Sequence, residues 1–165
     1  MSINTILFVI IPFVLMFATS VGMPFYKVSL IKKAGEKLIP LTKKSTLLSY
    51  FSAGIAIILM LLSIKVDYGR LNFVIPYCAV LGLFVTIRES ILYPINGVYE
   101  NLMIVGSDIL YYENMVSILS EEESHHPDYV LVIKTKNKGV RQFTFNNANE
   151  AAEVKKILEG VCNSK

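Results

Sequence analysis

The chain has little cysteine, no recognisable catalytic motif, and three long stretches without any charge. Two cysteines are too few for the disulfide framework of a small secreted protein, so Cys78 and Cys162 are expected to be free thiols. There is no Gly-x-Ser-x-Gly elbow, glycine-rich phosphate loop or His-Glu-x-x-His helix. These absences argue against the main hydrolase, nucleotide-binding and zinc-protease classes, and we expect neither an enzyme nor a bound cofactor or metal.

The three charge-free stretches are long apolar runs, Ile3–Phe25, Leu47–Ile64 and Leu71–Ile87. Each is close to the ~17–25 residues that a helix needs to cross the hydrocarbon of a bilayer. We therefore expect a multi-pass protein of the plasma membrane with helices at about 3–25, 47–64 and 71–92. Intramembrane ionisable groups usually form ion and proton pathways, and none lies inside a run. This argues against a transporter or channel that works alone.

The positive charges predict an orientation in the membrane. Residues 1–95 carry nine Lys/Arg and three acids, whereas residues 96–165 carry seven bases and ten acids, so the basic character belongs to the membrane half and not to a nucleic-acid-binding face. Because basic loops stay in the cytoplasm, we expect the loop 26–46 inside, the amino terminus outside and the carboxy-terminal part in the cytoplasm. A signal peptide is the less favoured interpretation of the first run, which lacks a basic start.

Six lysines in the basic loop are the candidate membrane-surface residues. One interpretation is a short interfacial helix held against anionic headgroups; the favoured one is a loop that only sets the topology. The six residues are Lys27, Lys32, Lys33, Lys37, Lys43 and Lys44.

Small residues in the apolar runs are candidates for close helix packing. Such residues let membrane helices approach one another, either within one chain or between this chain and a second copy or a partner. The candidates are Gly22, Ala53, Gly54, Cys78 and Gly82.

After Pro94 the pattern changes to short strands separated by turn residues, followed by one amphipathic helix. The helix is expected to begin near Asn147 or Asn149 as its cap and to run to Glu159, with Gly160 as its stop. Val140–Phe145 should be the second strand of a hairpin with Phe143 and Phe145 on one face. The six strands expected are 97–100, 102–105, 109–112, 116–120, 129–136 and 140–145.

The opening of this region carries a resemblance to a known family. Tyr93–Val105 includes Pro-Ile-Asn-Gly-Val-Tyr-Glu-Asn, and Ile109–Ile118 follows it. The segment resembles the "G-I-Y-E-N-G-I" opening of an uncharacterised family of bacterial membrane proteins with pleckstrin-homology-like (PH-like) domains. The resemblance implies an α+β membrane protein, with a transmembrane domain at 1–92 and a cytoplasmic PH-like domain at 93–165. Six visible strands are one fewer than a full PH barrel, as in a partial or open sheet.

An acidic run with two histidines lies between the fourth and fifth expected strands. Its residue types are those of metal ligands, but adjacent histidines beside a proline are more often a solvated loop, and we treat it as a candidate partner-binding loop. Its members are Glu121, Glu122, Glu123, His125 and His126.

Two functions follow from these patterns. The first is a membrane-anchored interaction or regulatory module that binds a membrane or cytoplasmic protein, or a second copy. By fold-level analogy with similar small membrane proteins, its setting would be envelope stress or self-protection (immunity) against bacteriocins. The second is an accessory subunit of a transporter or secretion complex that acts through its helices. Direct lipid-headgroup recognition by the domain is disfavoured by its negative charge.

Overall fold

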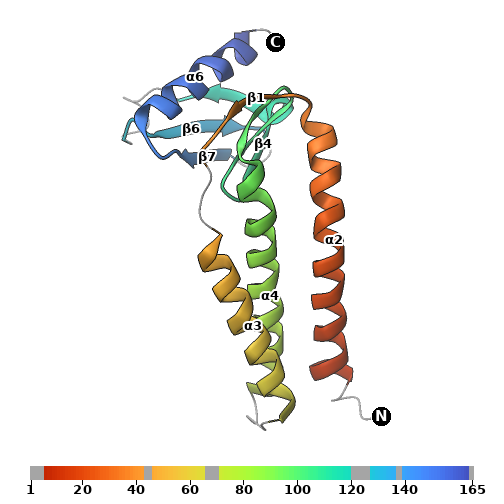
Figure 1. Cartoon of the computed structure of the whole chain (residues 1–165). Coiled ribbons are helices and arrows are strands. Elements are labelled where there is room, and N and C mark those ends of the chain that lie inside the picture. The colour runs from red at the N-terminus through yellow and green to blue at the C-terminus, as the bar shows by residue number, and fades with distance from the viewer. Residues whose placement is uncertain (1–5, 43–45, 66–70, 120–126, 137–138, 164–165) are drawn as a thin grey trace. The chain divides into compact units, whose positions relative to one another are not determined.

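The computed structural model describes residues 6–42, 46–65, 71–119, 127–136 and 139–163, and it has an α+β architecture (Figure 1). Its helices are η1 (Ile6–Ile10), α2 (Ile11–Ala34), α3 (Leu47–Lys65), α4 (Leu71–Leu92), the short turns η2 (Tyr93–Ile95) and η3 (Tyr112–Asn114), and α6 (Ala148–Asn163). Its strands are β1 (Lys37–Pro40), β2 (Gly97–Tyr99), β3 (Leu102–Val105), β4 (Asp108–Tyr111), β5 (Met115–Ile118), β6 (Val130–Thr135) and β7 (Gly139–Thr144).

The chain folds into two compact units that alternate along the sequence. A helical unit is made of Met1–Leu30 and Lys44–Pro94, and a strand unit is made of Ile31–Lys43 and Ile95–Lys165. This division differs from the expected boundary between residues 92 and 93, because the piece around β1 belongs to the strand unit. The strand unit therefore contains a segment that precedes α3 and α4 in the sequence.

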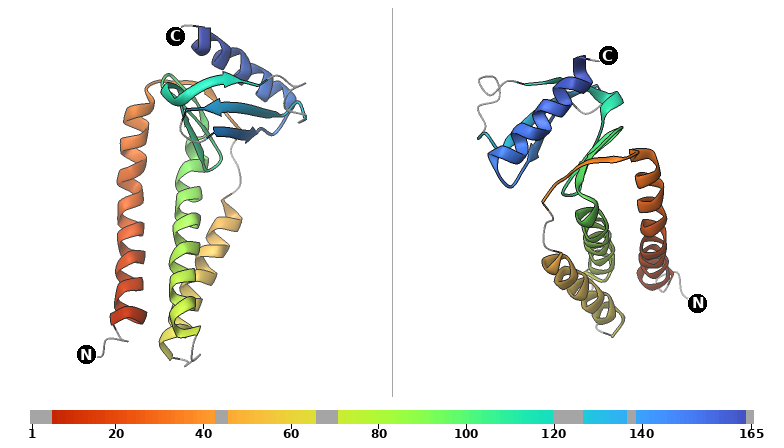
Figure 2. Two further views of the ribbon diagram at one scale, coloured as in Figure 1. Left: turned by 180° about the vertical axis from the view of Figure 1, so that it is seen from behind. Right: turned by 45° about the horizontal axis from the view of Figure 1, so that its top comes forward.

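In the helical unit α3 and α4 pack along each other, and both views in Figure 2 show them side by side. Ala56 and Met60 of α3 meet Ala79 and Leu83 of α4 in a small buried cluster. Ser49 Oγ donates a hydrogen bond to Glu89 Oε2 at 3.1 Å, which joins the two helices at the end that leads to the strands. The contact pairs small residues of α3 and α4 with larger apolar ones.

Two described helical segments are long and apolar enough to cross a membrane, Ile11–Ala34 and Val74–Ile95. Only 11% of the apolar stretch in the first segment is buried, and 22% of that in the second, so these are not core helices covered by protein. Among the described residues, two segments and not the expected three meet this criterion of length and hydropathy. Although α3 runs Leu47–Lys65, its apolar described part is Ser49–Leu62, which covers only about 21 Å at ~1.5 Å per residue.

The expectation that residues 26–46 form a loop is wrong, because α2 continues without a break to Ala34 and strand β1 follows it. The helix continues past Phe25 although Pro24 lies inside it, and Tyr26–Ala34 contains neither proline nor glycine. Gly35 ends it with a φ of 78°, a left-handed conformation that glycine adopts easily. The lysines of this region thus lie on a helix and a strand.

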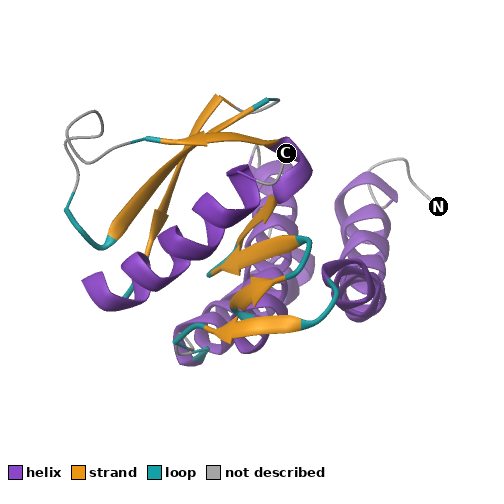
Figure 3. Cartoon of the chain, turned by 90° about the horizontal axis from the view of Figure 1, so that it is seen from above, coloured by secondary structure: helices purple, strands orange, loops and turns teal. Residues whose placement is uncertain are grey.

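The strand unit holds two antiparallel sheets, one in the order β1-β2-β3-β4 and one in the order β5-β6-β7. The expected hairpin is confirmed: β6 and β7 pair from Val130↔Thr144 to Thr135↔Gly139. Phe143 and Phe145 both point into the core. In Figure 3, α6 lies along the strands of this unit.

One core joins the two sheets and α6. Val98, Met103 and Leu110 come from the first sheet, and Ile133 from the second. The face of α6 contributes Ala151, Val154 and Leu158, each 0% exposed. The carboxy-terminal helix is longer than expected, because it continues past Gly160 to Asn163.

Candidate functional site

The expected membrane-surface lysines lie on different elements. The last part of α2 carries Lys27, Lys32 and Lys33. Lys32 and Lys33 are in the last turn, where a positive charge interacts favourably with the negative end of the helix dipole. Lys37 is in β1, and its ammonium group lies 5.6 Å from the centre of the Tyr99 ring. Lys43 and Lys44 fall outside the described residues.

The expected helix-packing residues do not all lie at contacts. A Cβ added at Gly22, Gly54 or Gly82 would meet nothing within 4 Å, and Cys78 is exposed. Ala53 is half-buried and packs against the α3–α4 cluster. The three glycines are therefore open to whatever surrounds the helices.

The acidic loop, from Glu121 to His126, lies outside the described residues. Among the residues that are described, no group of three His, Cys, Asp or Glu side chains could hold a metal ion.

The feature that joins distant parts of the sequence is β1, which sequence analysis did not predict. It pairs with β2 through Lys37↔Tyr99, Ile39↔Val98 and Pro40↔Gly97, with an irregularity between the first two pairs. Antiparallel neighbours are usually joined by a short turn, but here α3 and α4 are inserted between the two strands. The helix pair is thus an insertion into a β-hairpin.

A turn between β2 and β3 fixes the end of α2 and the start of β1. Asn101 Nδ2 donates to the Lys33 carbonyl at 3.2 Å, and the Asn101 N–H donates to the Ala34 carbonyl at 3.1 Å. Glu100 Oε2 accepts the Glu36 N–H at 3.1 Å, and the Glu100 N–H donates to the Glu36 carbonyl. Helix carbonyls at a carboxyl end need partners, and this turn supplies two donors.

Close packing at this turn requires glycine at position 35. A Cβ on Gly35 would clash with the Glu100 carboxylate and press on the Asn101 side chain. The Glu-Asn part of the motif noted in the sequence therefore has a structural role: Glu100 and Asn101 bind the end of α2 and the residues that follow it.

The other end of β1 is held by Glu150 in the first turn of α6. Glu150 Oε1 accepts the Thr42 N–H at 2.6 Å, and Oε2 accepts the Asn146 N–H at 3.2 Å. The Glu150 N–H in turn donates to Asn147 Oδ1 at 2.7 Å, so that Asn147 caps α6. Between the two attachment points Ile39 and Leu41 pack on the shared core. We call Ile31–Lys43, held in this way by Glu100, Asn101 and Glu150, the β1 strap.

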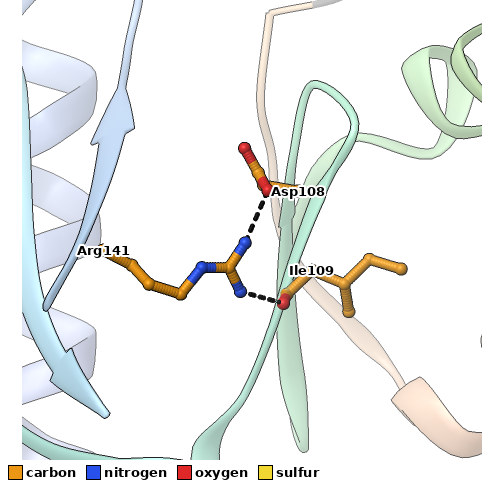
Figure 4. Close-up of polar contacts among 3 residues, drawn as sticks. All are labelled: Asp108, Ile109 and Arg141. Atoms are coloured by element: carbon orange, nitrogen blue, oxygen red, sulfur yellow. Dashed lines mark hydrogen bonds and ion pairs between the residues drawn. The ribbon is translucent and has the colours of Figure 1, made fainter. Parts of the chain in front are cut away.

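Arg141 links the outer strands of the two sheets (Figure 4). From β7 it donates through Nη1 to the Ile109 carbonyl on β4 at 2.8 Å, and through Nη2 to the Asp108 carboxylate. Its guanidinium also lies 5.2 Å from the centre of the Phe143 ring. A side chain therefore supplies hydrogen bonds to the edge of β4.

A groove runs beside α6 along the edge of the second sheet. Its two parts have volumes of about 510 and 440 Å³ and share Leu119, Lys155 and Glu159. Strand β5 forms one wall, and it is the outer strand of its sheet as far as the described residues go. Val116 of β5 is exposed in this wall, and Ala148, Ala151 and Ala152 leave room on the helix side. We call this the α6 groove.

A third cleft, of about 690 Å³, lies next to the turn that binds α2 and is lined in part by Lys33, Glu100 and Tyr112. Burial raises the pKa of the Tyr112 phenol and that of the Tyr99 phenol above their ordinary value.

Within the described residues, the strand unit has an outer sheet edge beside a groove that is lined by both apolar and charged side chains. A comparison with known proteins finds no matching family model, no similar curated protein and no similar solved structure.

Proposed function

We propose that this protein is a membrane-anchored interaction module whose strand unit is a PH-like domain divided by an inserted pair of membrane helices. The observation that carries the proposal is the strand pattern: antiparallel sheets of four and three strands, followed by one carboxy-terminal helix. The sequence resemblance implied the same barrel with one strand missing, and β1 supplies a seventh strand. Envelope stress or bacteriocin immunity is the setting that the resemblance implies.

The pairing of β1 with β2 supports three membrane crossings. Two strands of one sheet must lie on the same side of a bilayer, so the chain between Pro40 and Gly97 crosses an even number of times. If α4 spans the membrane, α3 must span it as well. The full length of α3, 19 residues, covers about 28 Å, close to the ~30 Å of hydrocarbon.

The charge distribution supports a cytoplasmic strand unit. Lys27, Lys32 and Lys33 lie on the part of α2 that leads into β1, and basic residues near helix ends favour the cytoplasmic side. The carboxy terminus would then be inside and the amino terminus outside.

The proposed partner is a protein that binds in the α6 groove and adds an extended segment to the outer edge of β5. Main-chain hydrogen bonds to a strand edge give affinity, and an adjoining groove selects the side chains. Val116 is 49% exposed on this strand. Val140 on β7 is 55% exposed and serves as a matched control.

The test is affinity purification of the full-length protein from its native membrane in mild detergent, with mass spectrometry of the proteins that co-elute. Val116→Lys should abolish recovery of a stoichiometric partner, because a long charged side chain would replace the exposed apolar one on β5 against which the added segment packs. Val140→Lys should leave recovery unchanged. Equal recovery with both variants would exclude the α6 groove as the binding site.

The open glycines favour the second candidate, an accessory subunit that acts through its helices. Because a Cβ at Gly54 or Gly82 meets nothing within the chain, Gly54→Leu and Gly82→Leu should fold normally. If either variant loses the co-eluting partner while Val116→Lys retains it, the helices carry the function. Retention in both glycine variants would exclude this candidate.

A further inference from the structure

The outer edge of β5 can pair with a further strand, whereas two other sheet edges of the strand unit are modified against such pairing. Strand β1 contains Pro40, and β4 already receives a hydrogen bond from Arg141 at the Ile109 carbonyl. A proline or a covering side chain reduces the ability of an edge to add a strand. Strand β5 contains no proline, and no side chain among the described residues is bonded to its edge.

The main-chain groups of Ile118 point away from the sheet. Ser117, one residue before it, pairs with Lys134 of β6. The Leu119 N–H, one residue after it, donates to the Val132 carbonyl at 2.9 Å. Residues of an antiparallel ladder alternate between bonding to one neighbour and facing the opposite side, so the N–H and C=O of Ile118 face the outer edge. A new antiparallel pair on this edge is therefore centred at Ile118.

The helix wall of the α6 groove carries one cation and one anion beside this stretch of β5. Lys155 and Glu159 are one turn apart on α6 and line both parts of the groove. Residues 116–119 form the opposite wall of the smaller part. A segment that pairs with β5 therefore comes with neighbours that have to suit both charges, an acid for Lys155 and a base for Glu159.

We propose that the protein that binds the α6 groove is a second copy of this chain: the two β5 strands pair antiparallel about a two-fold axis beside Ile118, and two three-stranded sheets become one. A two-fold interface uses the same surface twice, so it has to be its own complement. The axis also reverses α6, which lies along the strands (Figure 3), and Lys155 of each copy then faces Glu159 of the other. Val116, 49% exposed in the single chain, becomes covered.

This inference rests on the proposed function, because it names the partner of the same groove. It does not depend on how many helices cross the membrane, since all the residues involved belong to the strand unit.

The experiment uses two full-length copies of the protein that carry different affinity tags, expressed together and purified in mild detergent through one tag. Wild-type copies should be recovered together. Lys155→Glu in both copies, or Glu159→Lys in both copies, should lower recovery of the second tag about tenfold, because like charges then face each other at two places. A tenfold loss corresponds to ~1.4 kcal/mol.

One copy with Lys155→Glu and one copy with Glu159→Lys should associate again. Each contact between the copies then joins a glutamate to a lysine, while within each copy positions 155 and 159 carry the same charge. Restored recovery therefore cannot come from an ion pair inside one helix. Glu153→Lys, at another exposed position of α6, is the matched control and should leave recovery unchanged.

Unchanged recovery with either charge reversal would overturn the second copy as the partner, and so would a loss that the mixed pair of variants does not restore. If the tagged copies do not co-purify while a different protein is recovered and is lost with Val116→Lys, the α6 groove remains a binding site and only the identity of its partner is wrong. If neither a second copy nor another protein is recovered, both proposals fail.

Discussion

At the residue scale, a few polar side chains position segments that are far apart in the sequence. The carboxylates of Glu100 and Glu150 accept hydrogen bonds from the backbone of the β1 strap, and the Asn101 side chain donates one to it. Nothing in the sequence around these three residues marks them as functional, because none belongs to a catalytic or metal-binding motif. Their partners are main-chain groups more than 60 positions away, since they join residues 64, 68 and 108 apart.

Gly35→Ala should destabilise the strand unit by about 1–3 kcal/mol. A left-handed conformation costs an L-residue ~1–2 kcal/mol, and the added methyl group would displace the Glu100 carboxylate. Thermal unfolding of the purified protein in detergent should show a lower midpoint. Gly139→Ala shares the positive φ but meets nothing within 4 Å, so it separates the conformational cost from the clash. Equal losses in the two variants would mean that contact with Glu100 adds nothing.

Alkaline pH should destabilise the strand unit through its buried tyrosines. Burial raises the folded-state pKa of Tyr112 above its ordinary value of 10.0, so the folded form retains a proton that the unfolded form loses. The stabilising contribution is therefore complete below that ordinary value and is lost as the pH rises above it. Tyr112→Phe should make the unfolding midpoint less sensitive to pH in this range. An unchanged pH profile would show that Tyr112 does not set it.

At the element scale, local pattern predicted the strands and the carboxy-terminal helix but not β1. The apolar alternation and turn residues around Gly97–Tyr99, Leu102–Val105 and β6–β7 were enough to expect strands there. Lys37–Pro40 has only two apolar residues before its proline and follows a helix, so its pattern resembles that of a basic loop. Only the long-range pairing with β2 makes it a strand. The glycine after Ala34 was the available signal, because it marks the end of a helix.

Residues 95–165 alone should fold poorly, because without the β1 strap the edge of β2 and the core next to Ile39 and Leu41 are uncovered. Since Pro40 pairs with Gly97, residues 31–42 can be joined to 95–165 by a short glycine-asparagine turn in place of α3 and α4. The joined chain should show a cooperative unfolding transition and slow hydrogen exchange in β2. Equal protection in both chains would mean that β1 contributes little to the domain.

At the scale of the whole molecule, composition indicated a membrane part and a strand part, but not that the sequence would alternate between them. The helical unit and the strand unit each consist of two pieces of chain. A domain boundary read from a change of composition finds only the last of these transitions, near Pro94. The first of the three, between Leu30 and Ile31, lies inside the continuous helix α2 and has no turn signal.

The proposed topology predicts which positions share a side of the membrane. The background for this test has Cys78 and Cys162 replaced by alanine. In it, an impermeant maleimide should label Leu38→Cys on β1 and Val140→Cys on β7 from the same side. Asp67→Cys, between α3 and α4, should be labelled only from the other side. Labelling of all three positions from one side would mean that neither α3 nor α4 crosses the bilayer.

The inserted position of α3 and α4 also sets an order of events during synthesis. The segment that becomes β1 leaves the ribosome first and has no strand to pair with until β2 has been made, more than fifty residues later. In the proposed topology, both α3 and α4 must cross the bilayer in between, so that the chain returns to the side that holds β1. If only one of the two helices crossed, β1 and β2 would lie on opposite sides of the membrane, and the strand unit could not assemble. In that topology, folding of the strand unit depends on insertion of both helices.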